Sequence, residues 1–123
     1  MHPKRSSRVG GQIQREISEI VLLVLKDPKL GFITITDVEL TDDLRYAKVF
    51  YSVLGDEKEK KESLKGLERA KGFIQREIGK RIRLRHVPQI MFRYDNTAER
   101  AARIEQLLKQ VHLEPEAQDE GKV

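Results

Sequence analysis

The spacing of apolar residues switches between a helical and a strand-like period along the first half of the chain. Before Asp27-Pro28, which ends the pattern, apolar residues recur every three or four positions and predict an amphipathic helix. Residues 31–40 and 46–55 instead alternate at a period of two and predict two strands that pair as a hairpin. The alternation shifts phase near Asp37, which predicts a β-bulge. The apolar positions of the helix are Val9, Ile13, Ile17, Ile20, Val21 and Val24, and those of the second strand are Ala47, Val49, Tyr51 and Val53.

The second half of the chain predicts a long helix, a third strand and a last helix. The long helix begins after Gly55 with acidic residues in its first turn and runs to about Leu84. Pro88 breaks it, and residues 89–95 form the strand. The last helix, residues 96–111, is capped by its first or second residue and has an apolar face of Ala101, Ile104, Leu107, Leu108 and Val111. This order predicts an α+β domain with a three-stranded sheet and the helices packed on one face.

The long helix carries a stripe of basic residues. Its basic members are Lys65, Arg69, Arg76, Lys80 and Arg83. Gly72 lies on the same line, and the six positions are spaced three or four apart. On a straight helix they fall within about 80° of one another. The opposite side carries Leu67, Ala70, Ile74, Ile78 and Ile82. One face is therefore expected to pack on the sheet, while the other presents positive charge.

Two glycines, Gly72 and Gly79, interrupt this helix between Arg69 and Arg83, although each costs about 1 kcal/mol against alanine. Gly72 lies in the middle of the basic stripe, where it allows a bend and a close approach by a partner. The neighbouring Phe73 either packs in the core, which its position favours, or stacks on a base. Gly79 is consistent with close helix–sheet packing.

The charge distribution indicates what kind of partner the protein binds. The chain of 123 residues is 36% charged and 38% hydrophobic, with a formal net charge of +4. Residues 65–93 hold nine basic and two acidic residues, whereas the last ten residues hold one basic and four acidic residues. Many charged helix faces are merely solvated, but an imbalance of this size favours nucleic-acid binding. An acidic protein partner or a membrane surface also fits the charge alone.

Signals for other chemistry are weak. The chain has no cysteine, and the three histidines, His2, His86 and His112, lack the spacing of metal ligands. The segment GFIQREIGKR fails the phosphate-loop pattern in both its glycine spacing and the residue after the lysine. The apolar run Ile20–Leu25 is too short to span a bilayer. The sequence thus predicts a non-enzymatic, cytoplasmic protein without a metal or other cofactor.

Two segments in combination resemble the ribosome-binding factor A family. They are DPKLGFITITDVELTDDLRYAKVFYSVLG and ERAKGFIQREIGKRIRLRHVPQIMFRYD, and the resemblance covers about residues 8–111. It implies a type II KH-like fold in which an Ala-x-Gly kink, here Ala70-Lys71-Gly72, replaces the usual Gly-x-x-Gly loop. It further implies binding to the free small (30S) ribosomal subunit and its 16S ribosomal RNA. The roles implied are late subunit maturation, 16S 5′-end processing and growth in the cold.

On this reading the chain divides into a basic arm (residues 1–7), a KH-like RNA-binding domain (8–112) and an acidic tail (113–123) that we expect to be disordered. Basic side chains would neutralise phosphates of the ribosomal RNA, which positions the protein but carries little sequence information. The residues expected to do so are Arg76, Lys80, Arg81, Arg83 and Arg85, with Lys65, Arg69, Lys71 and Arg93 at the margins and Arg5 and Arg8 near the N-terminus.

Alternatives remain open at this point. A general single-stranded RNA chaperone, or cold-shock RNA binder, would bind any unstructured RNA through an exposed aromatic platform, and most of the aromatics fall on apolar positions. A protein-interaction module would use the basic face to bind an acidic partner. The sequence leaves open which ribosomal proteins or assembly GTPases cooperate. A monomer is expected, because no apolar face is left over once the core is assigned.

Overall fold

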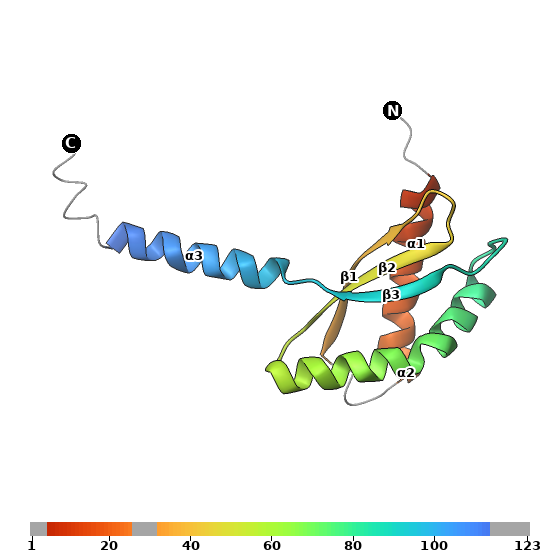
Figure 1. Ribbon diagram of the computed structural model, residues 1–123, viewed down its shortest axis with the longest axis horizontal. Coiled ribbons are helices and arrows are strands. Elements are labelled where there is room, and N and C mark those ends of the chain that lie inside the picture. Colours follow the sequence, from red (N-terminus) through yellow and green to blue (C-terminus); the bar gives the residue numbers. More distant parts are fainter. Residues whose placement is uncertain (1–4, 26–31, 114–123) are drawn as a thin grey trace.

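The computed structural model describes residues 5–25 and 32–113, which form three α-helices, one π-helical segment and three strands (Figure 1). In chain order these are α1 (Arg5–Glu19), η1 (Ile20–Leu25), β1 (Ile33–Leu40), β2 (Tyr46–Val53), α2 (Glu57–Arg81), β3 (Gln89–Tyr94) and α3 (Thr97–Leu113). Helix α1 begins within the segment assigned to the basic arm. The expected stop at Asp27-Pro28 and the acidic tail beyond Leu113 lie outside the described residues.

The strands form one mixed sheet in the order β1-β2-β3. Strands β1 and β2 pair as the expected antiparallel hairpin, and their register shifts between Ile35 and Asp37, which confirms the predicted bulge. Strand β3 runs parallel to β2, with Ala47 opposite Ile90. This parallel pairing requires a crossover, and α2 supplies it. The alternating positions of β2 from Ala47 to Val53 are buried, so the predicted inner face is also confirmed.

The core lies between this inner face and two helices, α1 and α2. In Figure 1 α1 lies behind the sheet and α2 curves along its lower edge, and the core combines residues of all these elements. The most deeply buried large side chains come from both helices and include Ile13, Ile17, Leu67 and Ile74. Each contributes roughly 1.5–3 kcal/mol relative to an exposed position. Phe73 packs against this core, as its position favoured.

Helix α2 is a single continuous helix that bends near its middle (Figure 1). Asp56 caps its N-terminus, because its carboxylate accepts from the Glu59 N–H while the Glu59 side chain accepts from the Asp56 N–H. The helix ends at Arg81, three residues before the expected end at Leu84. The expectation was wrong because Ile82 turns into extended backbone, with its side chain still buried in the core. Arg83 is therefore in the loop before β3 and does not continue the helical stripe.

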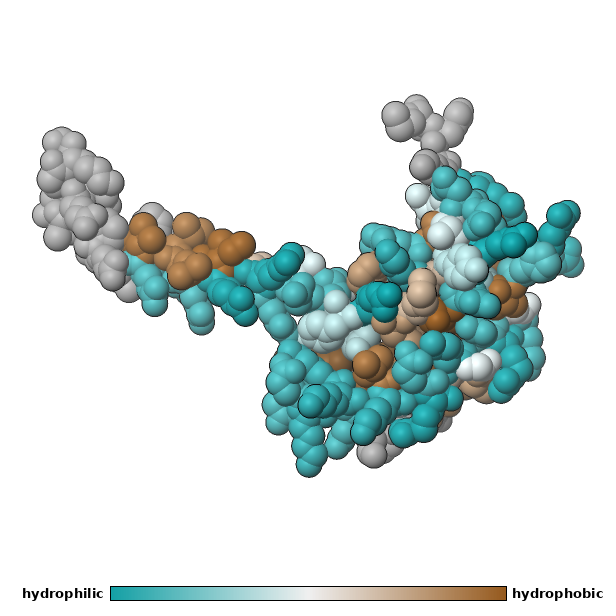
Figure 2. All heavy atoms as spheres, viewed as in Figure 1, coloured by the Kyte–Doolittle hydropathy of each residue, from teal (hydrophilic) through white to brown (hydrophobic). Residues whose placement is uncertain are grey.

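The third helix corrects the prediction that all helices pack on the sheet. Figure 1 shows α3 leading away from the sheet, and Figure 2 shows apolar side chains gathered along one side of it. Ile104, Leu107, Leu108 and Val111 are each more than half exposed. The first turn is held to the domain by Glu99, which accepts from Tyr94 Oη and from Lys60 Nζ. An apolar face is thus left over, and the premise behind the expected monomer was wrong.

Gly72 and Gly79 of α2 have different surroundings. A Cβ at Gly72 would meet only Arg76 Nη1, at 3.6 Å, so the helix surface there is open. A Cβ at Gly79 would lie 2.8 Å from Val87 Cγ2 in the loop before β3. Gly79 therefore allows this loop to lie against α2, a closer explanation than general helix–sheet packing.

We expect Gly72→Ala to raise the free energy of unfolding by up to about 1 kcal/mol, the ordinary helix preference for alanine over glycine. Gly79→Ala receives the same gain but must displace Val87, so its stabilisation should be smaller or reversed. Urea unfolding of both variants measures the difference. Repeating the pair on a Val87→Ala background removes the contacting methyl group and should make the two glycines equivalent. Equal gains on the unmodified background would contradict this assignment of Gly79.

Candidate nucleic-acid interface

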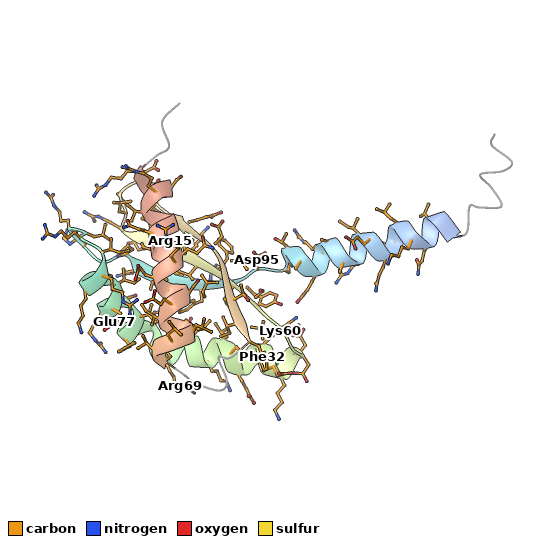
Figure 3. The ribbon with its side chains drawn as sticks, turned by 180° about the vertical axis from the view of Figure 1, so that it is seen from behind. Arg15, Phe32, Lys60, Arg69, Glu77 and Asp95 are labelled. Atoms are coloured by element: carbon orange, nitrogen blue, oxygen red, sulfur yellow. The ribbon has the colours of Figure 1, made fainter. Side chains whose placement is uncertain are left out.

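The basic face of α2 is built by the amphipathic pattern of the helix itself. Lys65, Arg69, Arg76 and Lys80 are exposed, while Leu67, Ile74 and Ile78 on the opposite side are buried against the sheet. Figure 3 shows Arg69 on the side of α2 that points away from the strands. We call these four basic residues the α2 face. The structure brings them together on one surface, as the helical spacing predicted.

Charges on the α2 face are largely uncompensated. In the described part of the chain, no acidic side chain forms an ion pair with Lys65, Arg69 or Arg76. Lys80 lies 3.4 Å from Glu77, but its side chain is 75% exposed, so this contact contributes little. Cations that lack internal partners remain available for phosphate oxygens. The open backbone at Gly72 leaves room for such a group between Arg69 and Arg76.

Arg81 faces the other way. Its Nη1 lies 3.0 Å from Glu16 Oε1 and 3.0 Å from Glu19 Oε1 on α1, and its Nε lies 3.7 Å from Glu77. The hydrogen bonds to Glu16 and Glu19, the one to Glu16 first, raise the pKa of the Arg81 guanidinium. Figure 3 shows Glu77 on the part of α2 beside α1. Arg81 thus joins α2 to α1 and does not belong to the α2 face.

We expect Arg81→Gln and Arg83→Gln to have opposite effects although they remove the same charge. Arg81→Gln should lower the urea midpoint, because three carboxylates lose their shared cation, and should change RNA binding little. Arg83→Gln, at an exposed loop position, should leave the midpoint unchanged and weaken RNA binding. Urea unfolding and a filter-binding titration on each variant separate the two roles. If the Arg81→Gln variant has normal stability but binds RNA more weakly, Arg81 belongs to the RNA interface after all.

The remaining predicted RNA-binding residues lie on other surfaces. Lys71 pairs with Glu68 at 2.9 Å, and its Nζ lies 5.9 Å from the Phe92 ring centre, at the sheet side of α2. Arg93 is exposed on β3, whose neighbouring residue Phe92 faces the core, so Arg93 points to the opposite face of the sheet. Arg8 is exposed on α1. The structure therefore does not bring these three residues together with the α2 face.

The last two, Arg5 and Arg85, meet at one end of the sheet. Together with Arg45 and His86 they line a hollow of about 530 Å³. Neither Arg45 nor His86 was predicted as a binding residue, because neither lies on a periodic face. Only folding brings the start of α1, the β1–β2 turn and the loop after α2 to one place.

Metal ligation and membrane insertion find no support in the part of the chain that the structure describes. No group of three or more histidine, aspartate or glutamate side chains is placed to hold an ion among residues 5–25 and 32–113. Within the same ranges, no helix has the length and apolar character needed to cross a bilayer.

Comparison with known proteins extends these observations. The model of the family Ribosome-binding factor A matches residues 5–108. Ribosome-binding factor A of Halothermothrix orenii is 51% identical over 120 residues, which cover 98% of both chains. The solution structure of a putative ribosome binding factor A from Thermotoga maritima has a TM-score of 0.66 and 42% identity, and covers 76% of this chain and 90% of its own. A homology model of the Thermus thermophilus factor, fitted into a cryo-EM map of a 30S complex, has a TM-score of 0.61 and 24% identity. The match covers 73% of this chain and 94% of the Thermus thermophilus chain.

Proposed function

Because the chain belongs to the ribosome-binding factor A family, we propose that it binds the free small ribosomal subunit through 16S ribosomal RNA and assists late maturation. A homology model of the Thermus thermophilus factor has been fitted into a map of its 30S complex, and this supports the small subunit as the partner. The proposed role includes processing of the 16S 5′ end and support of growth in the cold. The protein acts by binding and carries out no chemical step.

The observation that carries this proposal is the α2 face. Four exposed cations on one helix face, of which three have no acidic partner among the described residues, provide an electrostatic surface for RNA phosphates. Such contacts determine orientation and contribute affinity at any RNA sequence. Selectivity for the subunit therefore comes from its folded shape, which presents phosphates at the spacing of the α2 face. An occupied subunit is withheld from translation until maturation ends.

Sedimentation of the protein with free small subunits and with intact ribosomes tests the proposal. We expect co-sedimentation with free subunits that weakens steeply as salt is raised, and little with intact ribosomes. Unhindered binding to translating ribosomes would contradict a role restricted to subunit maturation. Binding that survives RNase treatment of the target would instead indicate a protein partner.

The exposed aromatic residues argue against the alternative of a general single-stranded RNA chaperone. Among the described aromatics, Phe32 (62% exposed) and Tyr46 (46% exposed) are the most accessible. They lie at opposite ends of the antiparallel hairpin, because Phe32 precedes β1 and Tyr46 begins β2. Phe32 lies opposite Leu54, eight residues along the strand from Tyr46, so their separation is roughly 25 Å at the usual rise per strand residue, too far for a shared platform. Comparable binding to any unstructured RNA would still favour this alternative.

A further inference from the structure

Three segments distant in sequence build a basic hollow at the end of the sheet where β2 and β3 begin. Its lining residues are Arg5, Asp43, Leu44, Arg45, Leu84, Arg85 and His86. In Figure 3 nitrogen-bearing side chains project from this region, near the start of α1 and the loop between α2 and β3. A volume of about 530 Å³ is within the range of small-ligand sites, roughly 300–1,000 Å³. The hollow is large enough for a group of nucleotide size.

The charge of the hollow is strongly positive. No ion pair joins Arg5, Arg45 or Arg85 to an acidic side chain within the described residues. The one carboxylate in the lining, Asp43, accepts from Thr41 Oγ1 at 2.6 Å and from the Arg45 N–H at 3.0 Å. These bonds, the first being the stronger cause, lower the pKa of Asp43 and commit it to the turn. Three guanidinium groups thus surround a space in which an anion is expected.

Backbone hydrogen bonds fix the segments that line this hollow. The Gln89 N–H donates to the Arg45 carbonyl at 2.8 Å, which ties the loop after α2 to the β1–β2 turn. The Leu44 N–H donates to the Thr41 carbonyl at 2.8 Å and closes the turn. Pro88, among the most deeply buried side chains, fixes the loop just before β3. Arg45 and Arg85 therefore sit on anchored segments, which reduces the ordering cost of binding.

An aromatic ring lies at the edge of the same surface. A second, shallower hollow of about 310 Å³ is lined by Arg45, Tyr46, His86, Val87 and Gln89. It shares Arg45 and His86 with the first hollow, so the two lie side by side. Tyr46 is 46% exposed at the start of β2. Cations beside an accessible ring are the combination by which proteins hold single-stranded nucleic acid.

We propose that this double hollow binds a nucleotide unit of single-stranded RNA, with its phosphate on Arg5, Arg45 and Arg85 and its base against Tyr46. A base must leave its helix to stack on a side chain, so the site selects an unpaired segment. The inference rests on the proposed function for the source of the RNA, but the chemistry of the hollow is separate from the α2 face. The hollow adds a second contact to the RNA interface. This contact distinguishes unpaired from paired RNA, whereas the α2 face responds to charge alone.

The test is a titration of the full-length, ¹⁵N-labelled chain with a short single-stranded oligouridylate and with uridine monophosphate. We expect saturable shifts of the amides of residues 43–46 and 84–89 with the oligonucleotide. The free nucleotide should shift the same amides but bind more weakly, because a nucleotide within a strand has a phosphate on both sides and the free one has a single phosphate. The double variant Arg45→Gln, Arg85→Gln keeps the backbone contacts of the hollow and should bind at least about tenfold more weakly. Tyr46→Leu should cost roughly tenfold through lost stacking. A matched control, Arg15→Gln with Arg100→Gln, removes the same charge at exposed positions outside the hollow.

Equal weakening in the hollow variant and the control would overturn the proposal, since net charge alone would then explain binding. Equal affinity for uridine monophosphate and the oligonucleotide would overturn the assignment to an RNA strand. Sedimentation with free small subunits distinguishes a failure of the hollow proposal from a failure of the proposed function. If the unmodified chain binds subunits and the hollow variant binds equally well, the hollow proposal fails while the proposed function stands. If the unmodified chain binds no subunit, the proposed function fails, and the oligonucleotide titration still decides the hollow.

Discussion

Reversing three charges, Arg76→Glu, Lys80→Glu and Arg83→Glu, is expected to abolish most of the affinity for free small subunits. Arg76 and Lys80 belong to the α2 face, Arg83 follows in the loop, and all three are exposed. Each cation–phosphate contact contributes about one unit to the slope of log affinity against log salt, so the slope should fall by about three. We expect a loss of at least about tenfold, equivalent to about 1.4 kcal/mol, at moderate salt. Sedimentation or filter binding at several salt concentrations measures both quantities.

Helix α3 offers a matched control for this experiment. Arg100→Glu, Arg103→Glu and Lys109→Glu change the net charge by the same amount, at exposed positions on a helix that leads away from the sheet. If the α2 face makes specific contacts, the control should retain most of its binding and its salt slope. Equal losses of affinity in both variants would show that binding depends on the net charge of the protein and not on specific contacts of the α2 face. Unchanged binding in the variant of the α2 face would move the contact surface elsewhere, with the hollow as the next candidate.

Local periodicity explains why much of the fold followed from the sequence. Alternation fixed the buried side of β2, and the phase shift at Asp37 located the bulge, because both depend on neighbours along one strand. The α2 face followed from helical spacing for the same reason. The apolar side of α3 was equally clear, but periodicity does not say what covers such a face. The structure leaves it exposed.

The parts of the site that escaped prediction depend on contacts between distant residues. Arg81 shares its sequence surroundings with Lys80, yet its partner Glu16 is 65 positions away, so no local pattern distinguishes the two cations. Arg45 reaches the hollow only because β2 pairs in parallel with β3 and brings the loop after α2 beside the β1–β2 turn. The composition of residues 65–93 favoured nucleic-acid binding. The division of basic residues into the α2 face, an interhelix ion pair and a hollow required the three-dimensional arrangement.

A pair of neighbouring glycines in α1 provides the largest expected difference in stability. A Cβ at Gly10 would lie 2.9 Å from the Val38 carbonyl oxygen, which belongs to the backbone of β1. At Gly11 no atom lies within 4 Å of the added Cβ. Both alanine variants gain about 1 kcal/mol of helix preference, so their difference reports the steric cost alone. Because a backbone atom in a paired strand cannot shift cheaply, we expect that cost to be about 1–3 kcal/mol.

Urea unfolding of Gly10→Ala and Gly11→Ala therefore measures how closely α1 must approach the sheet. Gly11→Ala should be more stable than the unmodified chain, and Gly10→Ala should lose most or all of that gain or become less stable. The buried neighbours Val9 and Ile13 bring α1 onto β1, and Gly10 sets the distance at which they do so. If the two alanine variants unfold at the same urea concentration, α1 has room to move away from β1. The close contact at Val38 would then not be required for the packing of this core.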